Sequence, residues 1–178
     1  LTKKGPLFLA DTTVNISPTA EELADITLLV AREVRNFNME PRVAMLSYSN
    51  FGSSDTPEAR LVAEASKIVK QKNPSLIVDG EMQGMLAFNK DILKENYPFS
   101  DLVDADVNVL IFPNLTAGNI AYHLLQQGQI QASTRWYEKG LNYQQQQKVV
   151  YEAEEFIIKP LGNNYVRLGD YDKAIALQ

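Results

Sequence analysis

The sequence predicts an α/β fold, in which a mainly parallel sheet is flanked by helices and followed by an all-α, helical-hairpin tail. Three observations support this prediction. Short apolar runs alternate with helical patterns through residues 1–125, small polar residues follow each apolar run, and residues 126–178 contain no β-rich run bounded by turns. Strands separated by helices pair in parallel, because each crossover helix returns the chain to the same end of the sheet.

Four apolar runs are the expected strands. The first, Pro6-Leu7-Phe8-Leu9-Ala10, is followed by the polar Asp11-Thr12-Thr13. The other three are residues 42–46, 76–78 and 107–112. Short apolar runs bounded by polar residues are typical of strands buried on both faces.

Three amphipathic stretches are the expected helices between these strands. The first opens at Ser17-Pro18-Thr19 with Pro18 in its first turn, the second begins at Pro57, and the third covers residues 117–125. Proline suits a first turn because its missing N–H has no helical partner there. Apolar residues three and four positions apart share one helix face. They are Leu23, Ile26, Val30, Val34 and Phe37 in the first helix, and Leu61, Val62, Ala65, Ile68 and Val69 in the second.

Charge and glutamine content change near residue 125. Residues 1–125 contain 11 Lys and Arg against 16 Asp and Glu, whereas residues 126–178 contain six of each. Two glutamines precede the change and nine follow it. These shifts predict two domains, an α/β lobe at 1–125 and a helical segment at 126–178. The alternative is one domain with a polar helical extension.

Composition excludes several classes of function. The chain has no cysteine and a single histidine, His123, which excludes thiolate metal sites and leaves no histidine cluster for zinc. We therefore expect no metal. A net charge of −5 and a pI of about 4.9 disfavour nucleic acid as a partner. No apolar run approaches the ~20 residues that span a bilayer, so we expect a cytoplasmic protein without a membrane partner.

Candidate ligand-binding residues follow the expected strands. Ligands of parallel sheets gather beyond the carboxyl ends of the strands. The candidates there are Asp11, Asn15, Ser47, Ser49, Asn50, Gly52, Ser53, Asp79, Glu81, Asn114 and Asn119. We expect the 47–54 loop to contact a phosphate through backbone N–H groups and hydroxyls, or else to be a well-capped turn. Asp79 either positions a ligand or caps the helix after its strand, with Gly80 easing the turn.

Three stretches together resemble the phosphate acetyl/butyryl transferase family. They begin with Phe8-Leu9-Ala10-Asp11-Thr12-Thr13-Val14-Asn15, Val78-Asp79-Gly80-Glu81-Met82-Gln83 and Phe112-Pro113-Asn114-Leu115-Thr116-Ala117-Gly118-Asn119. The resemblance covers residues 6–125. Residues 47–53 are most similar to the phosphotransacetylase-like C-terminal domain of bacterial NADP-dependent malic enzymes. Stand-alone phosphotransacetylases usually have a Thr-Lys pair where this chain has Asn50-Phe51.

The resemblance implies acetyl-CoA or phosphate as ligand and no covalently bound cofactor. It implies that residues 6–125 correspond to the second of two lobes, and that the family's Ser-Arg-Gly stretch lies beyond the matched residues. We assign no catalytic residue and expect a regulatory lobe that is catalytically incomplete. The partners implied are an acyl-CoA or phosphate and either a homo-oligomer or a chain that supplies the other lobe.

The tail is similar to a tetratricopeptide repeat. Leu161-Gly162, Tyr165, Gly169-Asp170-Tyr171 and Ala174-Ile175 have the spacing of such a repeat, and Gly169-Asp170 is the expected turn of a helix hairpin. Further helices are expected at 129–142 and 145–158. The alternative function is therefore a protein-interaction or assembly module that uses this tail. The tail is either a natural continuation or a fused segment, as in a fusion or an engineered chimera.

Overall fold

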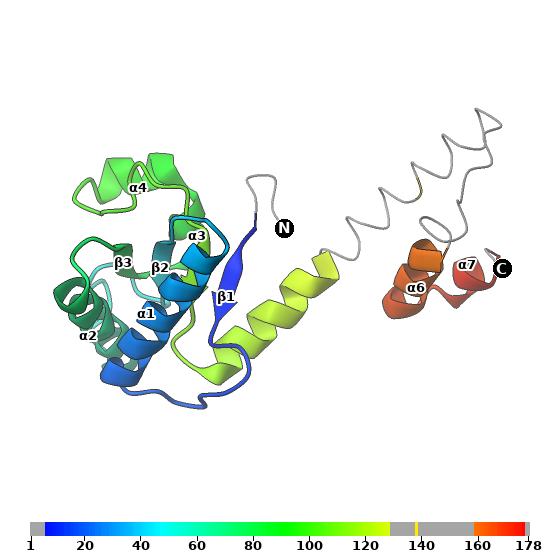
Figure 1. Cartoon of the computed structure of the whole chain (residues 1–178), viewed down its shortest axis with the longest axis horizontal. Coiled ribbons are helices and arrows are strands. Elements are labelled where there is room, and N and C mark those ends of the chain that lie inside the picture. Colours follow the sequence, from blue (N-terminus) through cyan, green and yellow to red (C-terminus); the bar gives the residue numbers. More distant parts are fainter. Residues whose placement is uncertain (1–5, 129–137, 139–158, 177–178) are drawn as a thin grey trace. The chain divides into compact units, whose positions relative to one another are not determined.

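A computed structural model describes residues 6–128, 138 and 159–176 (Figure 1). It contains two compact units, Leu1–Tyr122 and His123–Gln178. No helix in these described ranges combines the length and hydropathy that crossing a bilayer requires. The assignment of the two segments to separate domains at residue 125 stays a prediction.

The first unit is built on a four-stranded parallel sheet, which confirms the predicted fold class. The strands are β1 (Phe8–Ala10), β2 (Arg42–Leu46), β3 (Ile77–Met82) and β4 (Val109–Ile111). Their order in the sheet is β1-β4-β2-β3, and all three pairings are parallel. β2 and β4 are therefore the central strands.

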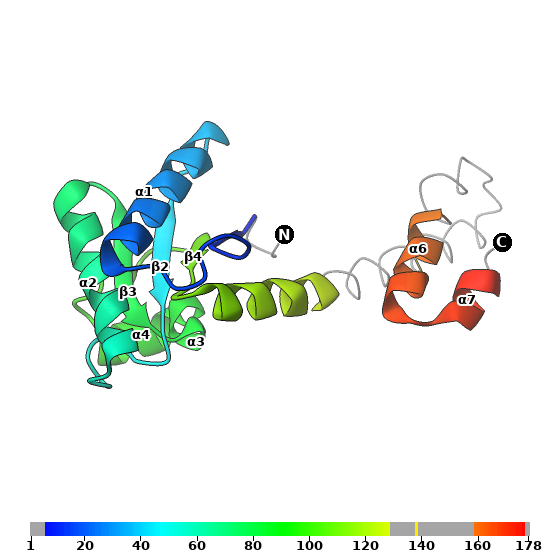
Figure 2. The same ribbon diagram turned by 90° about the horizontal axis from the view of Figure 1, so that it is seen from below.

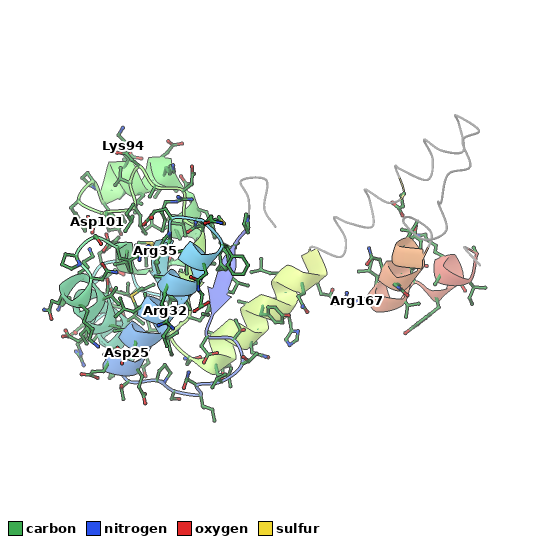
Figure 3. All side chains as sticks on the ribbon, in the orientation of Figure 1. Asp25, Arg32, Arg35, Lys94, Asp101 and Arg167 are labelled. Carbon is green, nitrogen blue, oxygen red and sulfur yellow. The ribbon has the colours of Figure 1, made fainter. Side chains whose placement is uncertain are left out.

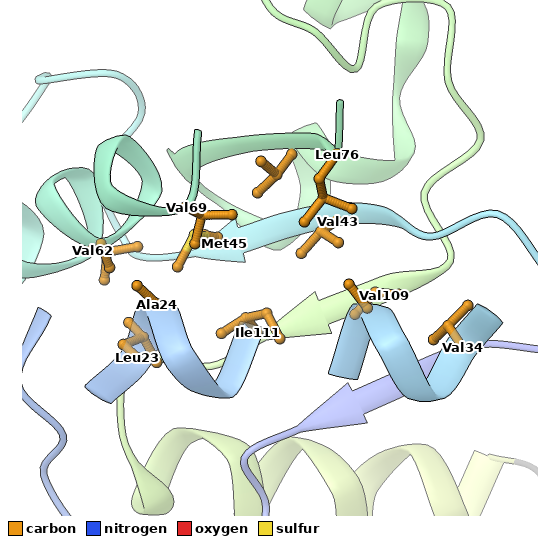
Figure 4. Packing of buried hydrophobic residues seen from close by; sticks show 13 residues of the cluster. Leu23, Ala24, Val34, Val43, Met45, Val62, Val69, Leu76, Val109 and Ile111 are labelled. Carbon is orange, nitrogen blue, oxygen red and sulfur yellow. The ribbon is translucent and has the colours of Figure 1, made fainter. Parts of the chain in front are cut away.

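Helices cover both faces of this sheet. Alternate residues of β2 point to opposite faces because a strand repeats every two residues. Val43 and Met45 join α1 (Ala20–Asn36) and α2 (Pro57–Lys72) in one buried cluster (Figure 4). Ala44 and Leu46 join a second cluster with α3 (Gly84–Phe88), α4 (Lys90–Asn96) and the helix at 115–128. Figure 2 shows α1 on the opposite side of the sheet from α3 and α4.

α1 begins later in the sequence than predicted, because Thr19 lies before its first turn. Thr19 is the N-cap residue, and its hydroxyl and the Glu22 carboxylate form a capping box. Pro18 therefore precedes the N-cap instead of lying in the first turn, because Thr19 accepts from the first turn's free N–H groups.

The buried face of α1 is also rotated from the predicted one. Its buried residues are Leu23, Ala24, Thr27, Ala31 and Val34, whereas Phe37 is 66% exposed. Ala24, Thr27 and Ala31 are small side chains on the buried face, whereas Val30 is only partly buried against the same cluster. The prediction for α2 agrees better with the structure. This helix begins at Pro57 after the N-cap Thr56, and it buries Val62, Ala65 and Val69 as predicted.

The helices α3 and α4 were not predicted from the sequence, and β3 extends beyond its predicted end at residue 78. Both helices are short, with five and seven residues, so neither shows a full amphipathic repeat. β3 continues through Asp79 and Glu81 to Met82. The alternative role of Asp79 as a helix cap is wrong, because the next helix starts at Gly84 after the N-cap Gln83.

The described part of the second unit contains α6 (Lys159–Leu168) and α7 (Tyr171–Ala176). Gly169, with a φ of 78°, and Asp170 join them, as the predicted hairpin requires. The Tyr165 hydroxyl donates to Glu138 at 2.6 Å. Burial, this hydrogen bond and nearby carboxylates raise the pKa of Tyr165 to about 12. The helices expected at 129–142 and 145–158 lie outside the described residues, apart from Glu138, and the tetratricopeptide-like nature of the tail stays a prediction.

Candidate functional site

The ends of β2 and β4 form the floor of a pocket that we call the rim pocket. These strands are neighbours in the sheet, so the residues that follow them emerge side by side. The rim pocket has a volume of about 400 Å³. Its lining residues are Leu46, Ser47, Tyr48, Glu58, Gly84, Phe112, Pro113, Asn114 and Ala117. It brings together two of the predicted ligand-binding residues, Ser47 and Asn114.

The rim pocket is mostly apolar with a few polar groups. Asn114 is held in place because its Oδ1 accepts from the backbone N–H of Ala117 at 3.0 Å, which caps the helix at 115–128. The Tyr48 ring is 56% exposed, and its hydroxyl forms a hydrogen bond with the hydroxyl of Thr56. Glu58 is the only charged residue among the described residues that line this pocket.

The polar groups of the 47–54 loop bind one another and the end of β3. Ser53 Oγ accepts from the N–H of Asn50 at 2.8 Å, and Ser49 Oγ accepts from the N–H of Ser54 at 3.0 Å. Asn50 Oδ1 accepts from the N–H of Gln83 at 2.8 Å. These hydrogen bonds are the ones expected from the alternative interpretation of the loop as a well-capped turn. Phosphate contact by Ser49, Asn50 and Ser53 stays a prediction.

Two buried carboxylates of β3 hold the structure around this loop. Glu81 is 2% exposed, and its Oε1 accepts from Ser49 Oγ at 2.8 Å and from the N–H of Gly52 at 2.6 Å. Asp79 is 5% exposed, and its Oδ1 accepts from Lys70 Nζ at 2.8 Å. Its Oδ2 accepts from the N–H of Asp101 at 3.0 Å.

Lys70 connects α2 to the segment that follows α4. Its Nζ lies 2.8 Å from a carboxylate oxygen of Asp79 and 2.8 Å from one of Asp101, which Figure 3 labels. Partial burial lowers the pKa of Lys70, but hydrogen bonds and charge attraction from Asp101 and Asp79 outweigh this and raise it above 10.5. The ammonium group is therefore a structural clamp between two acidic groups.

A second pocket, the charged pocket, is lined by other residues of the 47–54 loop than those that line the rim pocket. Its volume is about 480 Å³. It is lined by Phe51, Gly52, Ser54, Asp55, Ala59, Arg60, Ala63, Ser66, Lys67, Lys70, Asp79, Gly80, Glu81 and Phe99. Most of its charges are paired within the chain: Arg60 with Asp55, Lys67 with Glu64, and Lys70 with Asp79. Within the described ranges, no group of three histidine or carboxylate side chains is placed to hold a metal ion.

Asp11 and Asn15 organise the turn after β1. The Asp11 carboxylate accepts from the N–H groups of Thr13, Val14 and Asn15 at 2.6–3.0 Å, and from the Asn15 side-chain amide at 2.8 Å. Slight burial raises the pKa of Asp11, but these bonds outweigh it and bring the pKa below 3.8. Neither residue lines the rim pocket. Their predicted contact with a ligand stays a prediction.

Asn119 lies on the helix at 115–128 beside this turn, where its Nδ2 donates to the carbonyl of Thr12 at 3.4 Å. Gly118 makes the close approach possible, since a Cβ there would lie 2.0 Å from the Asp11 carbonyl oxygen. The structure thus divides the predicted residues into four groups, and one of them is Ser49, Asn50 and Ser53, which form hydrogen bonds within the 47–54 loop. Ser47 and Asn114 line the rim pocket, Gly52, Asp79 and Glu81 line the charged pocket, and Asp11, Asn15 and Asn119 lie around the β1 turn.

Sequence reasoning missed several residues of the two pockets. Tyr48 and Phe112 line the rim pocket, and both immediately adjoin predicted residues or strand ends, so the ligand rule for strand ends was enough to include them. No sequence pattern indicated Lys70, because its partners Asp79 and Asp101 lie on other elements of the fold. The aromatic contacts of Phe51 with Tyr97 and Phe99, at centroid distances of 4.9 and 5.1 Å, also needed the fold.

Comparison with known proteins agrees with the motif residues. Residues 1–132 match the family described as Phosphate acetyl/butaryl transferase. The NADP-dependent malic enzyme of Haemophilus influenzae is 53% identical over 121 residues, which are 68% of this chain and 16% of that protein. The phosphate acetyltransferase of Bacillus subtilis is 44% identical over 117 residues, which are 66% of this chain and 36% of that protein. The chain therefore spans well under half the length of either relative.

Solved structures give the same result for the fold. A phosphotransacetylase from Streptococcus pyogenes superposes with a TM-score of 0.62 at 39% identity, covering 66% of this chain and 35% of that chain. The phosphotransacetylase from Staphylococcus aureus superposes with a TM-score of 0.63 at 36% identity, covering 66% of this chain and 36% of that chain. Because the matched segment covers more than half of its length, the chain belongs to the phosphate acetyl/butyryl transferase family and contains a phosphotransacetylase-like domain related to the C-terminal part of NADP-dependent malic enzymes.

Proposed function

We propose that the α/β unit binds an acyl-CoA in the rim pocket and acts as a ligand-sensing, regulatory lobe of the phosphotransacetylase type. The observation that carries this proposal is the composition of the rim pocket. Apolar walls from Leu46, Phe112 and Ala117 surround a few oriented polar groups, among them Asn114 and Ser47. Ligand pockets combine apolar surface with a small number of placed hydrogen-bonding groups in this way.

The chemistry of an acyl-CoA fits this lining. Its pantetheine arm carries short hydrocarbon segments between two amides and ends in a thioester, all of them uncharged. No lysine or arginine is among the described residues of the rim pocket, and Glu58 adds a negative charge. We therefore assign the pocket to the acyl and pantetheine end of the ligand. Free phosphate alone is a poor ligand for it, because nothing there offsets its charge.

Ligand sensing is favoured over acyl transfer for the described residues. Transfer of an acyl group from CoA to phosphate brings two anions together and requires positive charge to offset their repulsion. The cations nearest the 47–54 loop are already paired: Lys70 with two carboxylates and Arg60 with Asp55. We propose that phosphate is held only where further positive charge is supplied.

Calorimetric titration of the full chain with acetyl-CoA, CoA and inorganic phosphate tests this function. We expect saturable binding of acetyl-CoA and none of phosphate. Asn114→Asp keeps the helix cap, since aspartate caps as well as asparagine, but adds a carboxylate to the pocket wall. The uncharged acyl and pantetheine end of the ligand would bury this carboxylate without a cation to pair with it, so acetyl-CoA binding should weaken about tenfold or more.

Asn89→Asp is the matched control. Asn89 caps α4 in the same way, with its Oδ1 accepting from the N–H of Ile92 at 3.1 Å, and it does not line the rim pocket. It changes the net charge equally, so it should leave the affinity within about twofold of wild type. No saturable binding of acetyl-CoA at millimolar concentration, or equal weakening by both variants, would contradict the proposed function.

The helical tail supports a second candidate, a protein-interaction module. Val166 on α6 and Tyr171 and Ile175 on α7 are 50–68% exposed, and exposed apolar side chains such as Tyr171 and Ile175, which share one face of α7, suit a protein partner. Sedimentation of the full chain would distinguish the candidates. If acetyl-CoA does not bind while Val166→Glu dissociates an oligomer, the interaction role replaces the ligand-sensing role.

A further inference from the structure

Glu81 receives a set of donors that resembles the binding site of a small anion. The N–H groups of Phe51 and Gly52, two successive residues, point at it: the first donates to its carbonyl oxygen at 2.9 Å and the second to its carboxylate at 2.6 Å. Ser49 Oγ donates to the same carboxylate oxygen at 2.8 Å. Phe51 and Gly52 have φ values of 47° and 87° and lie in a turn, and successive N–H groups of a turn can form an anion-binding nest.

No lysine or arginine in the described part of the chain pairs with this carboxylate, although Arg60 and Lys67 line the same charged pocket. The side chain is 2% exposed, so water does not replace these donors. One backbone N–H, that of Gly52, and the Ser49 hydroxyl therefore both donate to Oε1 of the buried carboxylate, and donors of these kinds also bind a phosphate.

We propose that Glu81 is a built-in anion that fills the donor nest of the 47–54 loop, and that it is a positioning residue for the rim pocket. A free phosphate would have to displace this carboxylate before it reached the same donors. The loop pattern that predicted phosphate binding is thus used by the chain itself. The positioning part of this inference rests on the proposed function, whereas the anion part does not.

Hydrogen bonds at the N-terminal end of the 47–54 loop link the donor nest to the rim pocket. The N–H of Ser47 donates to the carbonyl of Met82 at 2.9 Å, and Gln83 Nε2 donates to the carbonyl of Tyr48 at 2.8 Å. Ser47 and Tyr48 are pocket-lining residues on the same short loop as the nest. If the nest opens, both lose part of the support that fixes their position.

Chemical rescue by acetate tests the anion role. Glu81→Ala removes a CH₂–COO⁻ group, and acetate has the size and charge to replace it. The charged pocket gives access, since both Gly52 and Glu81 line it. We expect Glu81→Ala to lower the Tm by about 5–10 °C, because it leaves buried donors without an acceptor. Sodium acetate should then raise the Tm of the variant saturably, and by more than sodium chloride at equal ionic strength.

Glu22→Ala is the control. It also removes a hydrogen-bonding carboxylate, the one that accepts from the Thr19 N–H at 2.8 Å, but Glu22 is exposed and its loss opens no enclosed site. Acetate should therefore act on Glu22→Ala as it does on the wild type. An equal response to acetate in all three proteins would overturn the anion role.

Glu81→Gln tests the same point if the alanine variant does not fold. The amide oxygen can still accept from Ser49 and Gly52, but a neutral acceptor binds them less strongly. We expect a Tm below that of the wild type, and a Tm equal to the wild type would overturn the anion role.

Acetyl-CoA titration tests the positioning role separately. Glu81→Ala should bind acetyl-CoA about tenfold more weakly than the wild type, and acetate should restore most of this loss. Rescue of the Tm without rescue of affinity would overturn the positioning role and leave the anion role standing. If the wild type itself does not bind acetyl-CoA, the positioning role fails together with the proposed function, while the Tm measurements still decide the anion role.

Discussion

The rim pocket and the charged pocket are both lined by residues of the 47–54 loop, yet they use their polar residues differently. In the charged pocket, Asp79 and Glu81 are almost fully buried, and their oxygens accept from Lys70, Ser49 and backbone N–H groups. In the rim pocket, Glu58 is exposed and is the only charged residue that lines the described wall.

This difference separates stability from ligand binding. Charges that are buried and paired hold elements together, and removing one partner leaves the other without compensation. A mainly apolar pocket with a few oriented polar groups has surface left for a ligand. We therefore expect substitutions in the charged pocket to change the free energy of unfolding, and substitutions in the rim pocket to change affinity.

The largest expected effect comes from the same substitution placed in each pocket. Gly80 has a φ of 147°, and a Cβ there would lie 2.5 Å from the Met45 carbonyl oxygen. Gly80→Ala should lower the free energy of unfolding by roughly 3–5 kcal/mol through the clash and the strained backbone. A Cβ at Gly84, which lines the rim pocket, would meet no neighbouring atom within 4 Å.

Gly84→Ala is thus the control for Gly80→Ala. Alanine is favoured over glycine in a helix, and Gly84 begins α3, so the change should stabilise by up to about 1 kcal/mol. Urea unfolding of both variants gives the two values. Equal destabilisation by the two changes would remove the contrast between the pockets.

The next effect in size concerns Lys70. Lys70→Met should destabilise by about 1–3 kcal/mol, because Asp79, whose side chain is 7% exposed, loses its cation. The pKa of Lys70 is raised in the folded protein, so its contribution is fully present below pH 10.5 and is lost as pH rises through the higher folded value. The difference in Tm between wild type and Lys70→Met should therefore shrink above pH 10.5.

Lys67→Met supplies the matched comparison. Lys67 pairs with Glu64 at 3.4 Å between two exposed side chains, so its loss should change stability by less than about 0.5 kcal/mol. Thermal unfolding of both variants over the alkaline range separates the buried clamp from general lysine titration. A Lys70→Met effect no larger than that of Lys67→Met would show that the clamp is not a stabilising feature.

The sequence was sufficient for the sheet but not for the pairing of its polar residues. Apolar runs such as Arg42–Leu46 are confirmed as strands because burial on both faces leaves a local pattern. The rule for strand ends also indicated Ser47 and Asn114, and these two residues line the same pocket. Both results follow from rules that act over a few residues.

The remaining features depend on contacts between distant parts of the chain. Lys70 lies on α2, Asp79 on β3 and Asp101 beyond α4, so no local pattern predicts their clamp. No local pattern predicts the contacts of Glu81 either, because its carboxylate lies on β3 and accepts from Ser49 and Gly52 in the 47–54 loop. For this reason the sequence identified the polar residues of the 47–54 loop but could not tell a ligand from a carboxylate of the chain.

The smallest expected effect is on Tyr48, and it tests the rim pocket by affinity. Tyr48→Ala removes an aromatic wall from the proposed acyl-CoA site and should weaken acetyl-CoA binding about 3–10-fold, with little change in Tm because the ring is 56% exposed. Tyr48→Phe keeps the wall and loses only the hydrogen bond to Thr56, so its affinity should stay near that of the wild type. Titration with acetyl-CoA gives the affinity of each variant, and thermal unfolding gives its Tm. If Tyr48→Ala lowers the Tm by as much as Lys70→Met and leaves the affinity unchanged, the rim pocket is structural, and the contrast between the two pockets is wrong.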